Sequence, residues 1–169
     1  MHIAVIARVL GMLLMIFSLT MLSPIIVSSI YEENTSSMFV LAFAITLLVG
    51  LTFWLPTKSH QGELRTRDGF VVTVFFWLVL SGFGSLPLML SEATNLAFID
   101  ALFESVSGLT TTGATVLSGL DDLPKSILYY RQQLQWLGGI GIVVIALAIA
   151  YVILRKRKSD SNVRPDESQ

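Results

Sequence analysis

The sequence predicts an all-α membrane protein with four transmembrane helices and one shorter, re-entrant helix that is followed by an extended loop. Two observations predict this class. Of the 169 residues, 53% are hydrophobic and 14% are charged, whereas a soluble domain carries about 25% charged residues. The hydrophobic residues are gathered in four segments, each close to the roughly 20 residues that one bilayer crossing requires. Little length remains for a separate soluble domain.

The four apolar segments lie at about Ile3–Leu22, Met38–Leu55, Phe70–Leu90 and Leu134–Leu154. The first is longer than the apolar part of a typical signal peptide and has no clear small-residue cleavage site, so we expect it to be retained. In the third, Ser81–Ser85 followed by Pro87 predicts a close-packed and kinked stretch. In the fourth, Gly138–Gly141 predicts close helix packing or bending.

Clusters of basic residues follow the second and fourth segments, at Lys58, Arg65, Arg67 and Arg155–Lys158. The stretch between the third and fourth segments has Lys125 and Arg131 against a larger number of acidic residues: Glu92, Asp100, Glu104, Asp121 and Asp122. The positive-inside rule therefore predicts that both termini and the loop between the second and third segments are cytoplasmic. The chain then divides into two N-terminal helices with their cytoplasmic loop at 1–68, a span–loop–span unit at 69–154, and a polar cytoplasmic tail at 155–169.

The residue types exclude several functional classes. The chain has no cysteines, which excludes a disulfide framework and a thiolate metal site. His2 and His60 have no second ligand nearby in the sequence, and no catalytic set of side chains stands out, so we expect no enzyme and no other metal site. Arg155–Lys158 directly follows an apolar segment, which indicates a stop-transfer signal and not a nucleic-acid site. Arg131, at the outer end of the fourth segment, is expected to anchor that helix at the interface; the alternative is that it faces a pore.

The candidate functional residues lie in the stretch between the third and fourth segments. Ala97 to Leu109 has apolar side chains at helical spacing but is too short to cross a bilayer, which is typical of a re-entrant helix. It leads into Thr110–Val116, where threonine, valine and Gly113 favour extended backbone. Such a run turns successive carbonyls to one side, as in filters that replace the hydration shell of K⁺. The alternative is a polar surface turn, but the order of span, short helix, extended run and span favours the pore loop.

Acidic side chains accompany this stretch. Glu92 precedes the short helix, and Asp100 and Glu104 lie on it. We expect them to add negative potential at an outer mouth and to raise the local cation concentration. The C-terminal end of the short helix carries partial negative charge, so it is expected to favour a cation as well.

Two motifs carry a family resemblance. Residues 98–116, FIDALFESVSGLTTTGATV, closely resemble the first pore region of the Trk/Ktr potassium transporters, and residues 131–142, RQQLQWLGGIGI, resemble the start of the helix that follows. The chain is most similar to the TrkH/TrkG branch, over roughly residues 1–150. The resemblance implies two extra N-terminal helices and then the first of four span–pore helix–filter–span repeats. The expected fold is thus four transmembrane helices with one re-entrant pore helix and a selectivity-filter loop.

The resemblance also implies a function and its residues. K⁺, the transported ion, would be bound by the filter segment formed by Thr111, Thr112, Gly113 and Ala114. The implied activity is potassium uptake across the bacterial cytoplasmic (inner) membrane, without a covalently bound cofactor. The implied partners are membrane lipid, further copies in a homo-oligomer or a full-length transporter subunit, and a cytoplasmic ring of nucleotide-binding regulatory subunits.

The length of the chain leaves an alternative open. Family members carry four repeats around one ion path, and this chain carries the first, so a single copy cannot surround an ion. Either several copies assemble, or the chain is a truncated, non-conducting fragment that is inert or associates with a full-length subunit.

Overall fold

The computed structural model describes residues 3–58 and 66–162, and these form helices joined by loops. The elements are α1 (Ile3–Thr20), α2 (Ser23–Ile30), α3 (Ser36–Trp54), α4 (Thr66–Gly84), α5 (Leu86–Leu90), α6 (Phe98–Leu109), the 3₁₀ turn η1 (Leu120–Asp122) and α7 (Lys125–Asn162). Within the described residues, three stretches are long and apolar enough to cross a membrane: Ile3–Ile30, Ser36–Trp54 and Asp68–Leu90. The protein is therefore an all-helical, multi-pass membrane protein.

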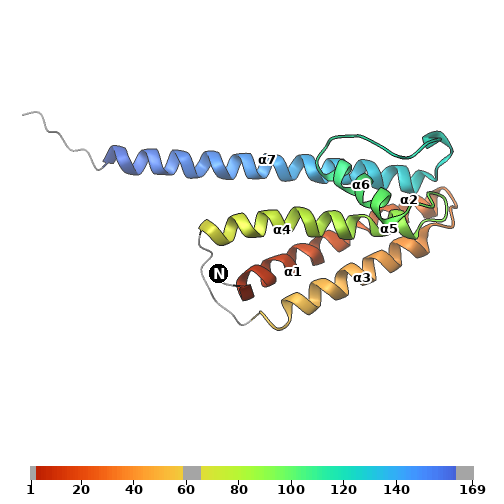
Figure 1. Cartoon of the computed structure of the whole chain (residues 1–169), viewed down its shortest axis with the longest axis horizontal. Coiled ribbons are helices and arrows are strands. Elements are labelled where there is room, and N and C mark those ends of the chain that lie inside the picture. Colours follow the sequence, from red (N-terminus) through yellow and green to blue (C-terminus); the bar gives the residue numbers. More distant parts are fainter. Residues whose placement is uncertain (1–2, 59–65, 163–169) are drawn as a thin grey trace, which may run out of the picture.

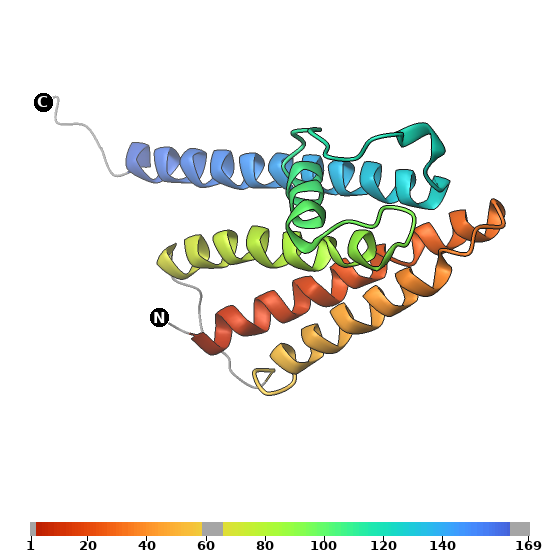
Figure 2. The same ribbon diagram turned by 45° about the vertical axis from the view of Figure 1, so that its right-hand side comes forward.

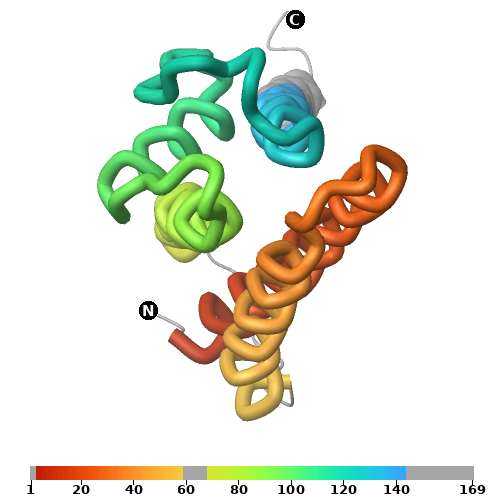
Figure 3. The backbone as a smooth tube through the Cα atoms, turned by 90° about the vertical axis from the view of Figure 1, so that its right-hand side faces the viewer, coloured from red at the N-terminus to blue at the C-terminus, as the bar shows by residue number. Residues whose placement is uncertain are grey.

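The long helices α1, α3, α4 and α7 have roughly parallel axes (Figure 1). Helix α1 packs against both α3 and α4, and α7 contacts the rest of the bundle mainly through α2 and α6. The start of α1, the end of α3, the start of α4 and the end of α7 lie at one end of the bundle, and α2 and α5 lie at the other (Figures 1 and 2). Helix α6 crosses α4 and α7 partway along their length (Figure 2). Seen along the bundle, α6 lies beside α4 and the first turns of α7, away from the pair α1 and α3 (Figure 3). The fourth predicted span lies within the continuous helical backbone of α7, and the side chains of 144–162 lie outside the described part of the chain.

The first span continues beyond its predicted end, because α2 follows α1 after a short break. Pro24 lies in the first turn of α2 and has no N–H to donate to the carbonyl of Thr20, four residues earlier. The side-chain amide of Gln133, on α7, donates to that carbonyl at 3.0 Å and to the Ser23 hydroxyl at 2.8 Å. A polar side chain of α7 thus replaces the hydrogen bond that the proline removes.

The third span is broken between α4 and α5, as the stretch before Pro87 predicts. The hydroxyl of Tyr130, which is 1% exposed, donates to the carbonyl of Gly84 at this break at 2.8 Å. A Cβ atom at Gly84 would lie 2.5 Å from the Ser105 hydroxyl oxygen, whereas one at Gly82 would have no atom within 4 Å. The predicted close packing is therefore located at Gly84, where α6 crosses, and not at Gly82.

The helices α1 and α3 form the most extensive pair. They approach through two glycines: a Cβ atom at Gly11 would lie 2.7 Å from the carbonyl oxygen of Gly50, and one at Gly50 would lie 3.0 Å from that of Gly11. Small residues at a crossing allow helix backbones to approach closely in a membrane. A buried core that joins this pair to α4–α7 includes Phe17, Met21, Phe39, Leu80, Leu88, Ala101, Leu109, Ile127, Tyr130 and Leu134.

The first turn of α7 is capped by Glu33, from the loop between α2 and α3. One carboxylate oxygen accepts the backbone N–H of Lys125 at 2.5 Å, and the other accepts the N–H and the hydroxyl of Ser126 at 3.1 and 2.6 Å. Two of the N–H groups that a helix start leaves unpaired are thereby satisfied. Burial by itself would raise the pKa of Glu33, but the hydrogen bonds from Ser126 and Lys125 outweigh it and hold that pKa below its ordinary value.

Candidate ion-binding site

The short helix predicted at Ala97–Leu109 is present as α6, and its C-terminal end lies directly against α7. A Cβ atom on Gly138 would lie 1.9 Å from the carbonyl oxygen of Leu109, and one on Gly108 would lie 3.0 Å from the Cβ of Leu134. By contrast, Gly141 has no atom within 4 Å of such a position. The close packing predicted for the glycine cluster of α7 is therefore at Gly138, where the end of α6 meets the helix backbone.

The backbone after α6 turns back and pairs with the last carbonyls of that helix. The N–H groups of Thr112 and Gly113 both donate to the carbonyl oxygen of Ser107, at 2.9 and 3.4 Å. In a trans peptide the carbonyl of one residue points opposite to the N–H of the next. The carbonyls of Thr111 and Thr112 therefore point away from α6, on a loop whose residues 110–116 are all exposed.

The start of this loop is a turn and not the extended run that the sequence predicts. Thr110 has φ −83° and ψ 1°, and Thr111 has a positive φ of 58°. The helix explains the difference, because its last carbonyls need donors and the turn supplies the N–H groups of Thr110 through Gly113 to them. Gly113, at φ 75°, adopts a left-handed conformation that other residues resist.

Ala114 differs from the two threonines before it. Its carbonyl oxygen accepts a hydrogen bond from the Ser107 hydroxyl at 2.6 Å, so that carbonyl is turned toward α6. The sequence-based expectation that the carbonyl of Ala114 joins those of Thr111 and Thr112 on one side is therefore not met. The reason is local, because the Ser107 hydroxyl lies within hydrogen-bond distance of this carbonyl oxygen and donates to it.

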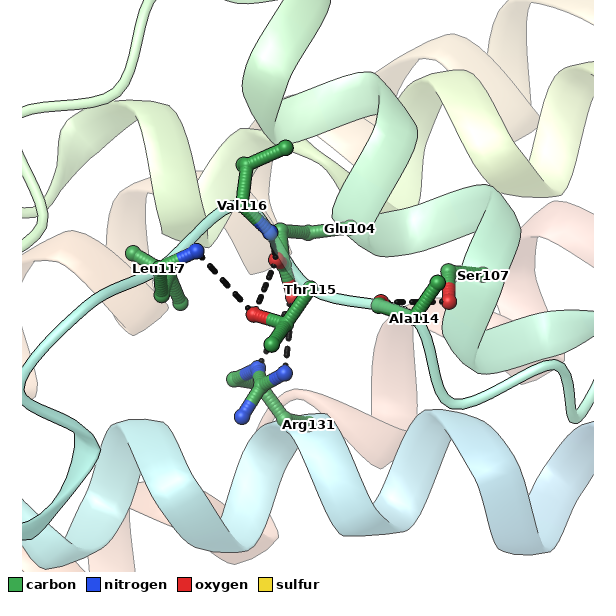
Figure 4. A network of polar contacts seen from close by, with 7 residues as sticks. All are labelled: Glu104, Ser107, Ala114, Thr115, Val116, Leu117 and Arg131. Atoms are coloured by element: carbon green, nitrogen blue, oxygen red, sulfur yellow. Dashed lines mark hydrogen bonds and ion pairs between the residues drawn. The ribbon is translucent and has the colours of Figure 1, made fainter.

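Glu104 of α6 and Arg131 of α7 form a buried ion pair that contacts residues 115 and 116 of the loop (Figure 4). One carboxylate oxygen of Glu104 is 2.9 Å from Nη2 of Arg131 and accepts its Nε–H at 3.0 Å. The other accepts the Thr115 hydroxyl at 2.5 Å and the Val116 N–H at 2.7 Å. The Thr115 hydroxyl oxygen in turn accepts the N–H of Leu117 at 3.0 Å.

This pair corrects two expectations drawn from the sequence. Glu104 is 4% exposed and its charge is matched by Arg131, so it is not a free charge at an outer mouth. Arg131 is neither a plain interfacial anchor nor an unpaired pore-facing charge. Sequence reasoning missed the pair because the two residues meet where α6 packs on α7. Asp100 lies in the first turn of α6 and is partly exposed, where a helix start favours negative charge.

The fold and this loop define a multi-pass helical membrane protein with a short helix and an irregular, carbonyl-bearing loop between its third span and α7. Residues 35–166 match the family described as TrkH, cation transport protein. The chain belongs to this family, which confirms the resemblance seen at 98–116 and 131–142.

The relatives agree with this assignment. The chain is 57% identical to the Trk system potassium uptake protein TrkH of Halomonas elongata, over 88% of its own length and 31% of the relative's. It is 48% identical to TrkH of Escherichia coli K12, over 90% of its own length and 32% of the relative's. A solved structure, the potassium transporter TrkH from Vibrio parahaemolyticus, is similar with a TM-score of 0.84 and 50% identity, covering 88% of this chain and 32% of that one. The chain thus spans about a third of the length of these relatives, which are transport proteins and not enzymes.

Proposed function

We propose that this chain contributes one filter segment to a potassium uptake pathway, in which the backbone carbonyls of Thr111 and Thr112 bind K⁺. The observation that carries the proposal is the direction of these carbonyls, which the N–H bonds of Thr112 and Gly113 to Ser107 turn away from α6. Carbonyls presented in this way replace the water shell of K⁺ in selectivity filters. The relatives of the chain are named as potassium uptake proteins, which supports K⁺ as the transported ion.

The proposal assigns α6 as a re-entrant pore helix and α7 as the fourth transmembrane helix. At 1.5 Å per residue, the 38 residues of α7 span about 57 Å, more than the roughly 30 Å of a bilayer core. Both termini lie on the cytoplasmic side of the inner membrane in this arrangement. Support comes from the ends of α3 and α7, which lie at the end of the bundle away from α2 and α5 (Figure 1). Lys58 follows the end of α3, and Arg155–Lys158 belong to the last turns of α7, which is the distribution that the positive-inside rule predicts.

The ion path needs further subunits or repeats. Residues 110–116 are all exposed, and a single loop cannot surround an ion. We propose that filter segments from other copies of the chain, or from a longer transporter, face this loop, and that Gly113 lines the path beside the two threonines. Membrane lipid would cover the apolar outer faces, and a cytoplasmic nucleotide-binding ring remains a proposed partner. Asp100 is the acidic side chain proposed for the outer mouth, whereas Ala114 is assigned to holding the loop.

The second candidate function is that of a non-conducting fragment that associates with a full-length subunit. The exposure of residues 110–116, on a loop that cannot surround an ion by itself, supports this candidate. Co-purification of the tagged chain with a full-length TrkH expressed in the same cells would support association, and recovery of the chain alone would support an inert fragment.

Potassium uptake in bacterial cells that lack their own potassium systems tests the first candidate. We expect cells that express the chain to take up K⁺ in preference to Na⁺, and Gly113→Ser to lose that preference. A serine in the left-handed conformation of Gly113 is strained by about 1–2 kcal/mol. We expect the backbone to relax this strain by changing its angles, which moves the adjoining carbonyls. Gly82→Ser is the matched control, since a Cβ atom there has no atom within 4 Å. No uptake, with the protein present in the membrane, would refute conduction by this chain alone.

A further inference from the structure

We infer that the Glu104–Arg131 ion pair is a positioning device that holds the distal part of the filter loop, residues 114–117, and thereby sets ion selectivity. The inference rests on the proposed function of the loop. The two side chains do not face the ion in this assignment; they act through Thr115 and Val116.

The ion pair has the geometry of a fixed support. The side chain of Glu104 is 1% exposed and that of Arg131 is 11% exposed. A carboxylate buried this deeply is costly unless it is paired and hydrogen-bonded, and both of its oxygens are engaged. Because Arg131 lies on α7 and Glu104 on α6, the pair fixes the loop relative to two helices at once.

The loop is held at successive points along its length. Its first residues pair with the carbonyl of Ser107, and Ala114 pairs with the Ser107 hydroxyl. Beyond Ala114, the carboxylate of Glu104 is the acceptor that holds the loop, and it accepts hydrogen bonds from Thr115 and Val116. An ionised carboxylate suits this position because it accepts at both oxygens and donates at neither.

Two single substitutions separate positioning from a simple charge effect. Arg131→Gln leaves a negative charge behind the loop, and Glu104→Gln leaves a positive one. If the pair acted by charge alone, these variants would shift the apparent K⁺ affinity in opposite directions, and the neutral double variant would recover. If the pair positions the loop, both single variants and the double variant lose K⁺ preference over Na⁺.

Thr115 supplies a matched comparison that leaves the ion pair intact. Thr115→Ser keeps the hydroxyl that donates to Glu104 and accepts the N–H of Leu117, and Thr115→Val keeps the shape but removes that hydroxyl. Because Thr115 is exposed, neither change disturbs the core. We expect Thr115→Ser to retain the wild-type K⁺ preference and Thr115→Val to lose it.

The test combines uptake with hydrogen exchange of the full chain in lipid nanodiscs, followed at the amide of Val116. Glu104→Ala removes both oxygens that accept hydrogen bonds, including the one bonded to the Val116 N–H. Loss of a hydrogen bond to a charged group corresponds to about tenfold or more in an equilibrium, so we expect exchange at Val116 to be about tenfold faster in Glu104→Ala and unchanged in Thr115→Ser. Unchanged exchange in Glu104→Ala, or a double variant with wild-type selectivity, would overturn the inference. If the wild-type chain takes up no K⁺, the proposed function fails, and exchange at Val116 still decides whether the pair holds the loop. If Glu104→Ala does not fold, the selectivity of the Thr115→Val and Thr115→Ser pair decides it.

Discussion

Replacing Gly138 by alanine should displace the end of α6 from α7. The added Cβ atom would lie 1.9 Å from the carbonyl oxygen of Leu109, 2.6 Å from its carbonyl carbon and 3.0 Å from its Cα, whereas real Cβ contacts essentially never fall below 3.0 Å. The two backbones must therefore separate by about 1 Å or more, since no flexible side chain is available to move instead. Overpacking of this kind costs about 1–3 kcal/mol and occasionally more.

The displacement reaches the proposed filter directly, because Leu109 is the last residue of α6 and the loop begins at Thr110. Thermal unfolding of the purified protein, followed by tryptophan fluorescence, measures the stability cost, and we expect Tm to fall by about 3–10 °C. Potassium uptake in the same cells as above measures the functional cost, and we expect it to be lost. Gly141→Ala is the matched control on the same helix, since its Cβ would have no atom within 4 Å.

Equal behaviour of the two variants would refute the reasoning. Alanine favours helix over glycine by about 1 kcal/mol, so Gly141→Ala should be neutral or slightly stabilising. If Gly138→Ala is as stable as Gly141→Ala and transports equally well, then α6 does not depend on its close contact with α7.

Two further predictions concern the packing of the spans and the cap of α7. Gly11→Ala should push α1 away from α3, because its Cβ would lie 2.7 Å from the carbonyl oxygen of Gly50. We expect the free energy of unfolding to fall by about 1–3 kcal/mol in the same assay, whereas the control Gly82→Ala should be unaffected. An unchanged Tm in Gly11→Ala would contradict the close crossing. Glu33→Gln should remove the negative charge at the start of α7, at a cost of about 0.3–1 kcal/mol. The pKa of Glu33 is lowered in the folded state. The extra stability of the wild type over Glu33→Gln should therefore be full above the unfolded pKa of about 4.3 and should vanish as pH falls through the lower folded pKa. A stability difference that persists in the most acidic samples would argue against the cap.

The apolar segments and the short helix were predictable from the sequence because they depend on local composition. A run of about 20 apolar residues leaves few alternatives in a bilayer, where backbone groups must pair within the segment. The helical spacing of Ala97–Leu109 and the break before Pro87 are likewise local signals, and the structure has helix α6 and the α4–α5 break at these places. The turn at Thr110 and Thr111 was mispredicted, since residue preferences favoured extended backbone while the end of α6 required donors.

The amino-acid sequence by itself determined the class of the protein, its family and the position of the loop, because hydropathy, charge asymmetry and motif spacing are properties of the chain alone. Only the tertiary structure decided that Glu104 is paired with Arg131 and not exposed, that the Ala114 carbonyl turns toward α6, and that Glu33 caps a helix that starts 92 residues later. Each of these contacts joins separate elements. Their physical basis is the packing of helices and loops against one another, which brings charges, donors and acceptors into contact that no periodic pattern in the sequence relates.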